Sequence, residues 1–371
     1  SLPEDGGNTM RRAAKGRRGA MQGMMMGGSF IAGFILCFLL VSLLSPGERL
    51  LRKDERRSYR SSIEPESRIC NSSVLTSSFN KDEILSSFER SWQHTLNLHS
   101  KLSSMLDKEV FTLESPWSHF NLLPPVGPKC KAGMITLGSA GGQDNEKRFC
   151  GPKALKRRDC VVISVGGHGE WGFEMGVYES TSCIVHTFDC NGNYSVPFQL
   201  QSRVFFHKIC LGPVDQGDYM SWPSILKMLG YKSPPTFLKM DIEGWEYSVL
   251  TSIINTGYML PHQIAVELHW YTGGVGGVYW RGPLPKMMEN AHRFYMTKDY
   301  VDAGYMPTDR DPPTYSYKTP GEIALFGAFL FMKGGYMIVD RKDNPDCKHC
   351  TELLLARLIC SPRSWHGEFS L

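Results

Sequence analysis

Two acids and a histidine stand at the ends of apolar runs that have the composition of buried strands. The run Thr236–Met240 leads directly to Asp241, and the run Gln263–Leu268 carries Glu267 and leads to His269. The carboxyl ends of parallel strands meet at one edge of an open α/β sheet, where such sheets bind ligands. A base at that edge is placed to take a proton from a bound hydroxyl group. The pattern predicts catalytic residues in the order Asp241, His269 and Glu267, although His269 also fits a structural role, bonded to loop backbone.

A glycine turn and a further acid come earlier in the chain. The apolar run Cys160–Val165 is followed by three glycines, namely Gly166, Gly167 and Gly169. Glycines let a ligand approach the backbone, and the helix expected from about Gly172 offers free N–H groups. The next run, Cys183–Phe188, ends at Asp189, about twenty residues past the turn, where an acid can accept hydrogen bonds from ribose hydroxyls. These features predict a site for a nucleotide-type cofactor.

The sequence around Asp241 resembles a known signature. Residues 238–246 read Leu-Lys-Met-Asp-Ile-Glu-Gly-Trp-Glu, which is similar to the Lys-x-Asp-x-Glu-Gly-x-Glu pattern of FkbM-type methyltransferases. Other blocks, spread over most of residues 115–360, resemble the methyltransferase-like protein 24 group: Asp144–Cys150, Cys160–Glu174, Cys183–Asp189, Gln263–His269 and Gly335–Glu352.

The resemblance implies a Rossmann-like methyltransferase fold with S-adenosylmethionine as the methyl donor. It places the methionine end of this cofactor at the glycine turn, its ribose at Asp189 and its sulfonium beside Asp241. The family usually has an acid at the end of the first strand, and this chain has Ser164 there. Glu170 and Glu174 are the nearest candidates for a substitute carboxylate.

The elements that must position these residues alternate between strand and helix. Five strands are expected, at residues 160–165, 183–188, 203–209, 236–240 and 263–268. Helical stretches near 219–230 and 244–256 separate the later strands, and Glu243 or Glu246 can open the second of these helices, where acids favour the helix dipole. Such alternation predicts an α/β fold with a mostly parallel sheet. Residues 335–341 and 351–358 are expected to add an antiparallel hairpin at its edge.

Two segments outside these strands carry further predictions. Residues 115–159 are rich in Pro, Gly and Lys and are expected to form an irregular lead-in, which a Cys130–Cys150 bridge would close. The motif Cys347-Lys348-His349-Cys350 has the spacing of half a zinc site. No second Cys or His pair at suitable spacing accompanies it, so a disulfide is preferred and no metal site is predicted.

An aromatic loop follows the last catalytic candidate. From Trp270 to Gly282 aromatic side chains alternate with glycines, and the candidates for substrate contacts are Trp270, Tyr271, Tyr279 and Trp280. Flat apolar faces on a flexible loop suit a sugar ring or another planar acceptor. The alternative is a surface loop whose aromatics pack into the core. A helix is expected next, over Leu284–Asp302.

The N-terminal part predicts a membrane anchor and a stem. Residues 1–23 indicate a cytosolic tail, and residues 24–44 carry no charge and are long enough to cross a hydrocarbon core of about 30 Å. A cleaved signal peptide is the competing interpretation. Residues 45–114 are expected to form a stem whose apolar residues between Asp82 and Val110 recur at helical spacing. Residues 115–371 would form the methyltransferase-like domain.

Cysteines and glycosylation motifs indicate where that domain lies. Ten cysteines follow Cys37, and the triplets at Asn71 and Asn193 fit N-glycosylation acceptors. Disulfides and glycans favour the lumen of the Golgi or another secretory compartment. The net charge of +4 is concentrated near the N-terminus, so no nucleic-acid partner is expected. The oligomeric state is not indicated.

Three functions fit these features. The first is a lumenal O-methyltransferase that acts on a glycan or glycoconjugate. The second is a glycosyltransferase in which Asp241 and Glu243 hold a metal-bound nucleotide sugar. The third is a non-catalytic binding protein with the same fold, to which Ser164 points.

Overall fold

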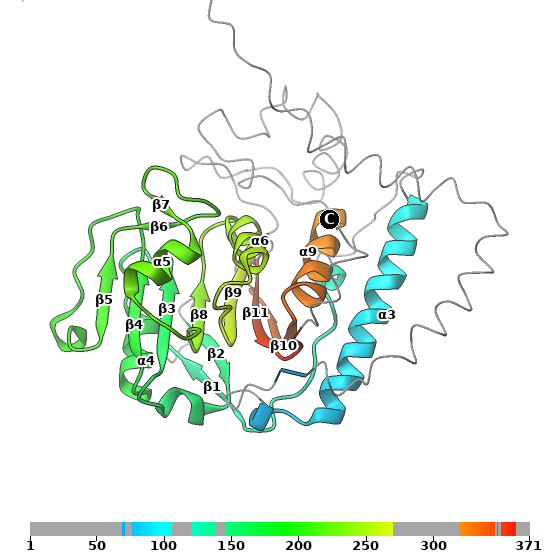
Figure 1. Cartoon of the computed structure of the whole chain (residues 1–371), viewed down its shortest axis with the longest axis horizontal. Coiled ribbons are helices and arrows are strands. Elements are labelled where there is room, and N and C mark those ends of the chain that lie inside the picture. Colours follow the sequence, from blue (N-terminus) through cyan, green and yellow to red (C-terminus); the bar gives the residue numbers. More distant parts are fainter. Residues whose placement is uncertain are drawn as a thin grey trace, which may run out of the picture. The chain divides into compact units, whose positions relative to one another are not determined.

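The structure is a computed structural model, and it describes residues 69–70, 76–105, 120–138, 146–269, 320–345, 347 and 350–360. A seven-stranded sheet organises this part of the chain (Figure 1). In spatial order its strands are β10 (Tyr336–Asp343), β11 (Cys350–Arg357), β9 (Gln263–His269), β8 (Phe237–Met240), β3 (Val161–Val165), β4 (Ile184–Phe188) and β5 (Val204–His207). The five strands from β9 to β5 pair in parallel, as predicted.

The C-terminal hairpin is also confirmed, and the structure adds its position. Strand β11 pairs antiparallel with both β10 and β9, so it lies inside the sheet while β10 forms the edge. The sequence of β11 explains this place, because Leu353 and Leu355 are buried on one face of the sheet and Leu354 and Ala356 on the other. A strand that is apolar on both faces is stable only when both are covered.

Three helices cover one face of the sheet: α5 (Trp222–Leu229), α6 (Glu246–Thr256) and α9 (Pro320–Met332). On this face the strands contribute Ile163, Leu238 and Ile264 to the core. Helix α4 (Gly172–Ser180) covers the other face, where the strands contribute Val162 and Phe237. Period-two alternation along each strand separates the two cores.

The segment before β3 is more ordered than predicted. Instead of an irregular lead-in, residues 134–150 contain the antiparallel strands β1 (Met134–Leu137) and β2 (Lys147–Cys150), followed by a short 3-10 helix over Pro152–Lys156. The predicted Cys130–Cys150 disulfide is present. The sequence of β2, Lys-Arg-Phe-Cys, does not indicate a buried strand because two of its four residues are charged. Lys147 is nevertheless buried.

The predicted amphipathic helix is α3 (Lys81–Met105), and it packs on the sheet domain. Its Ile84 is fully buried in the second core, and the ring of Phe88 lies 4.9 Å from that of Phe331 in α9. Just before it, a Cys70–Cys360 disulfide joins the chain to the residues that follow β11. Helix α3 therefore belongs structurally with the domain.

The other described cysteines also pair: Cys160 with Cys183, Cys190 with Cys210, and Cys347 with Cys350. Several predicted features lie outside the described residues: the tail 1–23, the anchor 24–44, the motif at Asn71, the aromatic loop with Trp270, Tyr271, Tyr279 and Trp280, and the helix over Leu284–Asp302. Among the helices that are described, we find none with the length and apolar character needed to cross a bilayer.

Candidate active site

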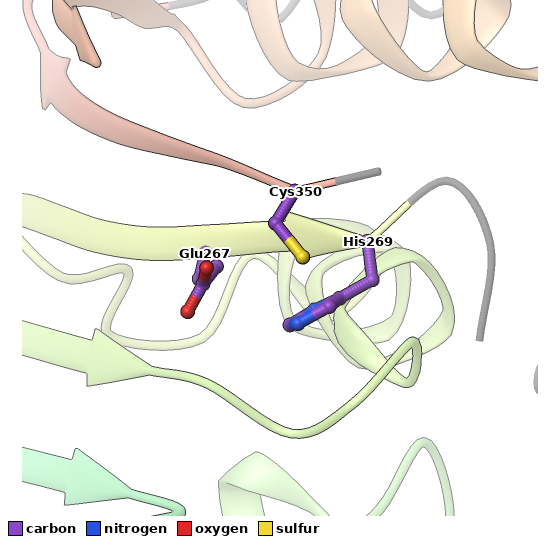
Figure 2. A group of neighbouring side chains, drawn as sticks. All are labelled: Glu267, His269 and Cys350. Carbon is purple, nitrogen blue, oxygen red and sulfur yellow. The ribbon is translucent and has the colours of Figure 1, made fainter. Parts of the chain in front are cut away.

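Charged side chains gather on one face of the sheet at the carboxyl ends of β8 and β9. Side chains two residues apart on a strand share a face. Lys239 and Asp241 are so related at β8, and Glu267 and His269 at β9, where Figure 2 shows both on the same side of the strand. Strand β11 places Glu352 directly opposite Glu267. Strand periodicity and antiparallel register thus build the cluster.

Asp241 is a carboxylate between two lysines. Its side chain is 20% exposed, and Oδ2 lies 3.9 Å from Nζ of Lys147 and 4.0 Å from Nζ of Lys239. Burial by itself would raise the pKa of Asp241, but Lys239 and Lys147 outweigh it and hold this pKa below its usual value. Asp241 is therefore ionised throughout the physiological pH range and reachable from solvent.

Lys239 ties this carboxylate to the glycine turn. Its ammonium group donates to the backbone oxygens of Val165 and Gly166 at the end of β3. Gly166 has a φ of +73°, and a Cβ at this position would overlap with the backbone oxygen of Asp241. Only glycine accommodates this backbone conformation and this close approach without strain.

The second lysine comes from the β1–β2 hairpin. Lys147 has a fully buried side chain, and its ammonium group donates to Glu352. Burial lowers the pKa of Lys147, but Glu352 and Asp241 more than compensate and raise it above the ordinary value. Sequence reasoning missed both Lys147 and Glu352: they lie in two separate blocks of the family resemblance, and nothing local pairs residues that are 205 positions apart.

Glu267 is neutral at pH 7. Burial, together with the negative charges of Asp241 and Glu352, raises the pKa of Glu267 to about 8. Its Oε1 accepts a hydrogen bond from Nδ2 of Asn344 at 2.9 Å, and its carboxyl group is hydrogen-bonded to Asp241. A protonated carboxyl donates that bond, so Glu267 serves Asp241 as a donor.

His269 is held by a buried carboxylate. Its Nδ1 lies 3.2 Å from Oε1 of Glu246, and its Nε2 lies 3.7 Å from Oε2 of the exposed Glu243. Burial lowers the pKa of His269, but Glu246 dominates and raises it to about 10. The imidazole is therefore charged at neutral pH. It stabilises nearby anions and has no free nitrogen with which to act as a base.

Glu246 closes the turn between β8 and α6. This side chain is fully buried, and its carboxylate accepts hydrogen bonds from the backbone N–H groups of Ile242 and Gly244 at 2.9 Å. The expectation that an acid opens this helix is confirmed for Glu246. Its second task, holding His269, was not predicted.

Asp189 lies across the glycine turn from this cluster. Its Oδ2 accepts hydrogen bonds from the backbone N–H of Gly167 at 3.3 Å and of His168 at 2.9 Å, and its Oδ1 accepts one from Asn191 at 2.8 Å. The two carboxyl oxygens together offer about four acceptor directions, so one remains at Oδ1. Most of the hydrogen-bond acceptor positions that were expected to bind a ribose are thus used to hold the backbone of the turn.

A small pocket adjoins Asp189. It has an empty volume of about 190 Å³ and is lined by the turn and by Trp171, Tyr194 and Phe206. The ring of Tyr194 meets that of Phe206 edge to face, with centroids 5.7 Å apart. The pocket therefore brings a carboxylate and aromatic rings together beside the glycine turn.

Ser164 leaves the end of β3 without an acid. Its hydroxyl is buried and has no hydrogen-bond partner among the described residues. Glu174 accepts a hydrogen bond from the hydroxyl of Thr187 at 2.9 Å, inside the protein, and Glu170 is exposed. Of the two candidates for a substitute carboxylate, Glu170 lines the small pocket beside Asp189 and Glu174 does not.

A larger pocket opens on the other side of the cluster. It lies between the β1–β2 hairpin and strands β10 and β11, and its empty volume is about 660 Å³. Its wall carries charges of both signs: Glu146, Arg148, Asp340, Lys342 and Glu352. Because Glu352 also binds Lys147, one residue links this pocket to the surroundings of Asp241.

The structure thus brings Asp241, Glu267 and His269 into one cluster, as predicted, and separates Asp189 from them by the glycine turn. The predicted substrate contacts at Trp270, Tyr271, Tyr279 and Trp280 lie outside the described residues.

A family model described as "Methyltransferase domain" matches residues 114–305, just over half of the chain. No curated protein matches this sequence. The match begins before β1 and includes β9, so it spans the turn, Asp189 and the charged cluster.

Many solved structures are similar at low sequence identity. A putative rRNA methylase from Clostridium thermocellum is 11% identical, with 57% of this chain and 92% of that chain covered and a TM-score of 0.30. A putative hemolysin from Streptococcus thermophilus is 12% identical, with 62% and 80% covered and a TM-score of 0.32. The 1,6-didemethyltoxoflavin-N1-methyltransferase from Burkholderia thailandensis is 10% identical, with 55% and 72% covered and a TM-score of 0.29.

Proposed function

This chain belongs to the methyltransferase-domain family and is an S-adenosylmethionine-dependent methyltransferase, and on that premise we propose that it methylates a hydroxyl oxygen of a glycan or glycoconjugate. The family favours this reaction over the nucleotide-sugar alternative. The motif Lys239–Glu246 further supports a relation to the FkbM-type and methyltransferase-like protein 24 groups.

One observation carries the proposal: Asp241 is an ionised, partly exposed carboxylate directly beside the glycine turn. A hydroxyl group is a weak acid, so a base next to the acceptor oxygen matters for methyl transfer. Of the three predicted catalytic residues, Glu267 and His269 are protonated at pH 7, since their pKa values are about 8 and about 10. Asp241 alone can accept the proton.

The described residues fit the cofactor. The turn has no room for a Cβ at Gly166, Asp189 keeps one acceptor direction for a ribose hydroxyl, and Tyr194 and Phe206 offer flat walls. When bound, S-adenosylmethionine supplies an electrophilic methyl group. The protein aligns the acceptor oxygen and holds its proton at Asp241. Lys147 and Lys239 keep this carboxylate ionised for that purpose.

The nature of the acceptor is inferred from chemistry and location. The larger pocket is lined by side chains of both charges, among them Glu352 and the ion pair of Arg148 with Asp340, which suits a ligand with many hydroxyl groups. Five disulfides and the exposed Asn193 motif fit an oxidising, glycosylating compartment. We place the domain in the lumen, behind an anchor at residues 24–44.

The proposed location can be tested with a glycosidase. Treatment of the protein from cells should lower its apparent mass, and an unchanged mass would argue against the lumen.

The reaction can be tested with labelled S-adenosylmethionine and a glycoprotein mixture, before and after enzymatic removal of the glycans. We expect label to appear only when glycans are present. Asp241→Asn should lower the transfer rate by about 10²- to 10⁴-fold, the usual contribution of a general base. Calorimetry should show that this variant still binds the cofactor and that Asp189→Ala binds it more weakly.

Three outcomes would contradict the proposal. Normal turnover by Asp241→Asn would remove the assigned base. Label on the deglycosylated proteins alone would point to a protein side chain as the acceptor. Tight binding of a nucleotide sugar, without binding of S-adenosylmethionine, would instead favour the glycosyltransferase.

A further inference from the structure

We propose that reduction of the Cys347–Cys350 disulfide turns Glu267, His269 and Cys350 into a binding site for zinc. Figure 2 shows the three side chains on neighbouring strands, all directed to the same side. One ligand atom from each residue lies within 4.8 Å of those from the other two. All three residues are buried.

The sheet itself creates this arrangement. Cys350 is directly opposite His269 in the antiparallel pairing of β11 with β9, and Glu267 lies two residues before His269. Residues directly opposite one another in an antiparallel pair point to the same face, and so do residues two apart on one strand. The three groups are therefore held by strand backbone and not by a loop.

The set of ligands suits zinc better than magnesium or calcium. Thiolate sulfur, imidazole nitrogen and carboxylate oxygen all bind zinc, with bonds of about 2.0–2.3 Å. A tetrahedral ion with such bonds separates its ligand atoms by roughly 3.3–3.8 Å. Movements of about an ångström would close the site, and three protein ligands leave the fourth position to water.

Neighbouring groups already orient two of the ligands. Glu246 binds Nδ1 of His269 at 3.2 Å, so a metal ion would bind Nε2 and would replace the contact of Nε2 with the exposed Glu243 at 3.7 Å. Asn344 donates to Oε1 of Glu267 at 2.9 Å, and its own Oδ1 accepts a hydrogen bond from the backbone N–H of Cys347. Carboxylates behind a ligating histidine and hydrogen bonds to a ligating acid are usual around zinc.

The disulfide controls access to this site. In the structure the Cys350 sulfur is bonded to Cys347, and a disulfide sulfur is not a thiolate ligand. A dithiol reductant would transfer two electrons and two protons to the pair, yielding two cysteine thiols and its own disulfide. Zinc would then bind as Cys350, His269 and Glu267 release their protons to water. Glu267 and His269 would serve the charged cluster in one state and the metal in the other.

A variant can open the site without any reductant. Cys347→Ser leaves Cys350 as a free thiol. Cys350→Ser is the matched control, because it also leaves one free thiol, but at Cys347. Zinc content is measured on the full chain by competition with a chromophoric chelator. We expect one zinc ion per chain in Cys347→Ser and none in Cys350→Ser or the oxidised wild type.

Cobalt substitution adds a spectroscopic readout. Cobalt bound by a thiolate gives a sulfur-to-metal absorption band, which we expect only in Cys347→Ser. Adding His269→Ala to this variant should abolish the band, and adding Glu246→Gln should weaken zinc binding about 10- to 100-fold. Circular dichroism checks that each variant is folded. If Cys347→Ser does not fold, limited reduction of the wild type, with mass spectrometry to locate the opened disulfide, replaces it.

Equal zinc binding by Cys347→Ser and Cys350→Ser would overturn the proposal, and so would a cobalt complex without the sulfur band. The site does not depend on the proposed methyl transfer. Binding of S-adenosylmethionine, measured on the same oxidised samples, tests that function separately.

Discussion

Asp241, Glu267 and His269 lie in one cluster but carry different charges. The nearby lysines keep Asp241 ionised, burial beside other acids keeps Glu267 protonated, and Glu246 keeps His269 charged. A base, a neutral donor and a cation thus stand together at neutral pH. Environment, not residue type, assigns their roles.

The neutral state of Glu267 predicts a pH-dependent stability. Because its folded pKa of about 8 exceeds the ordinary value of 4.5, the folded protein holds a proton that the unfolded chain releases between these values. Stability should therefore fall as pH rises through this window. Glu267→Gln cannot ionise, so its thermal midpoint should fall less between pH 5 and pH 9 than that of the wild type. If the thermal midpoints of the two proteins fell equally between pH 5 and pH 9, Glu267 would not be protonated in the folded protein.

At the scale of the elements, the turn after β3 connects the two parts of the candidate site, namely Asp189 and the charged cluster around Asp241. Asp189 binds its backbone N–H groups from one side, and Lys239 binds its carbonyl oxygens from the other. The β1–β2 hairpin then covers this region and brings Lys147 beside Asp241. A turn held from both sides can present a rigid backbone to a cofactor.

Two glycines with nearly equal backbone angles test this tight packing. Gly166 has a φ of +73° and Gly230 a φ of +74°, but only at Gly166 would an added Cβ overlap with another backbone atom. Gly230→Ala should cost about 1–2 kcal/mol, for left-handed backbone alone. Gly166→Ala should cost more and should weaken the binding of S-adenosylmethionine. Denaturant unfolding and calorimetry measure the two effects, and equal losses in both variants would contradict the packing argument.

At the scale of the whole molecule, disulfides join parts of the chain that are distant in sequence. Cys70 and Cys360 are 290 residues apart, and Cys130 and Cys150 are 20 apart. The first disulfide holds the segment before α3 against the end of β11, where Ile69 bridges to Ile359. It closes nearly the entire described region into one loop.

Loop length predicts unequal contributions to stability. A cross-link that closes a longer loop removes more entropy from the unfolded chain. Replacing Cys70 and Cys360 with Ser should cost about 5 kcal/mol, and the same change at Cys130 and Cys150 about 3 kcal/mol. Denaturant unfolding of the two double variants compares them directly. A larger loss at the short loop would show that local packing outweighs loop closure.

Much of this architecture could be predicted from local patterns. Apolar runs followed by glycine or acid identified β3, β4, β8 and β9, and chain order made them parallel, so Asp189, Asp241 and His269 were expected at one edge. Lys147 could not be predicted, because a buried lysine in a short charged strand has no local signal. Glu352 became a neighbour of Glu267 only through the insertion of β11 between β9 and β10.

The sequence alone determined the alternation of strands and helices and the residues at the carboxyl ends of the parallel strands, because strand periodicity and chain order are local properties of the chain. Only the tertiary structure decided which of those residues is an anion at neutral pH, as the proposed base must be. The pKa values of Asp241, Glu267 and His269 depend on Lys147, Glu352 and Glu246, and long-range packing in a buried setting brings these partners within a few ångströms. Charge interactions across a folded core have no signature in sequence spacing.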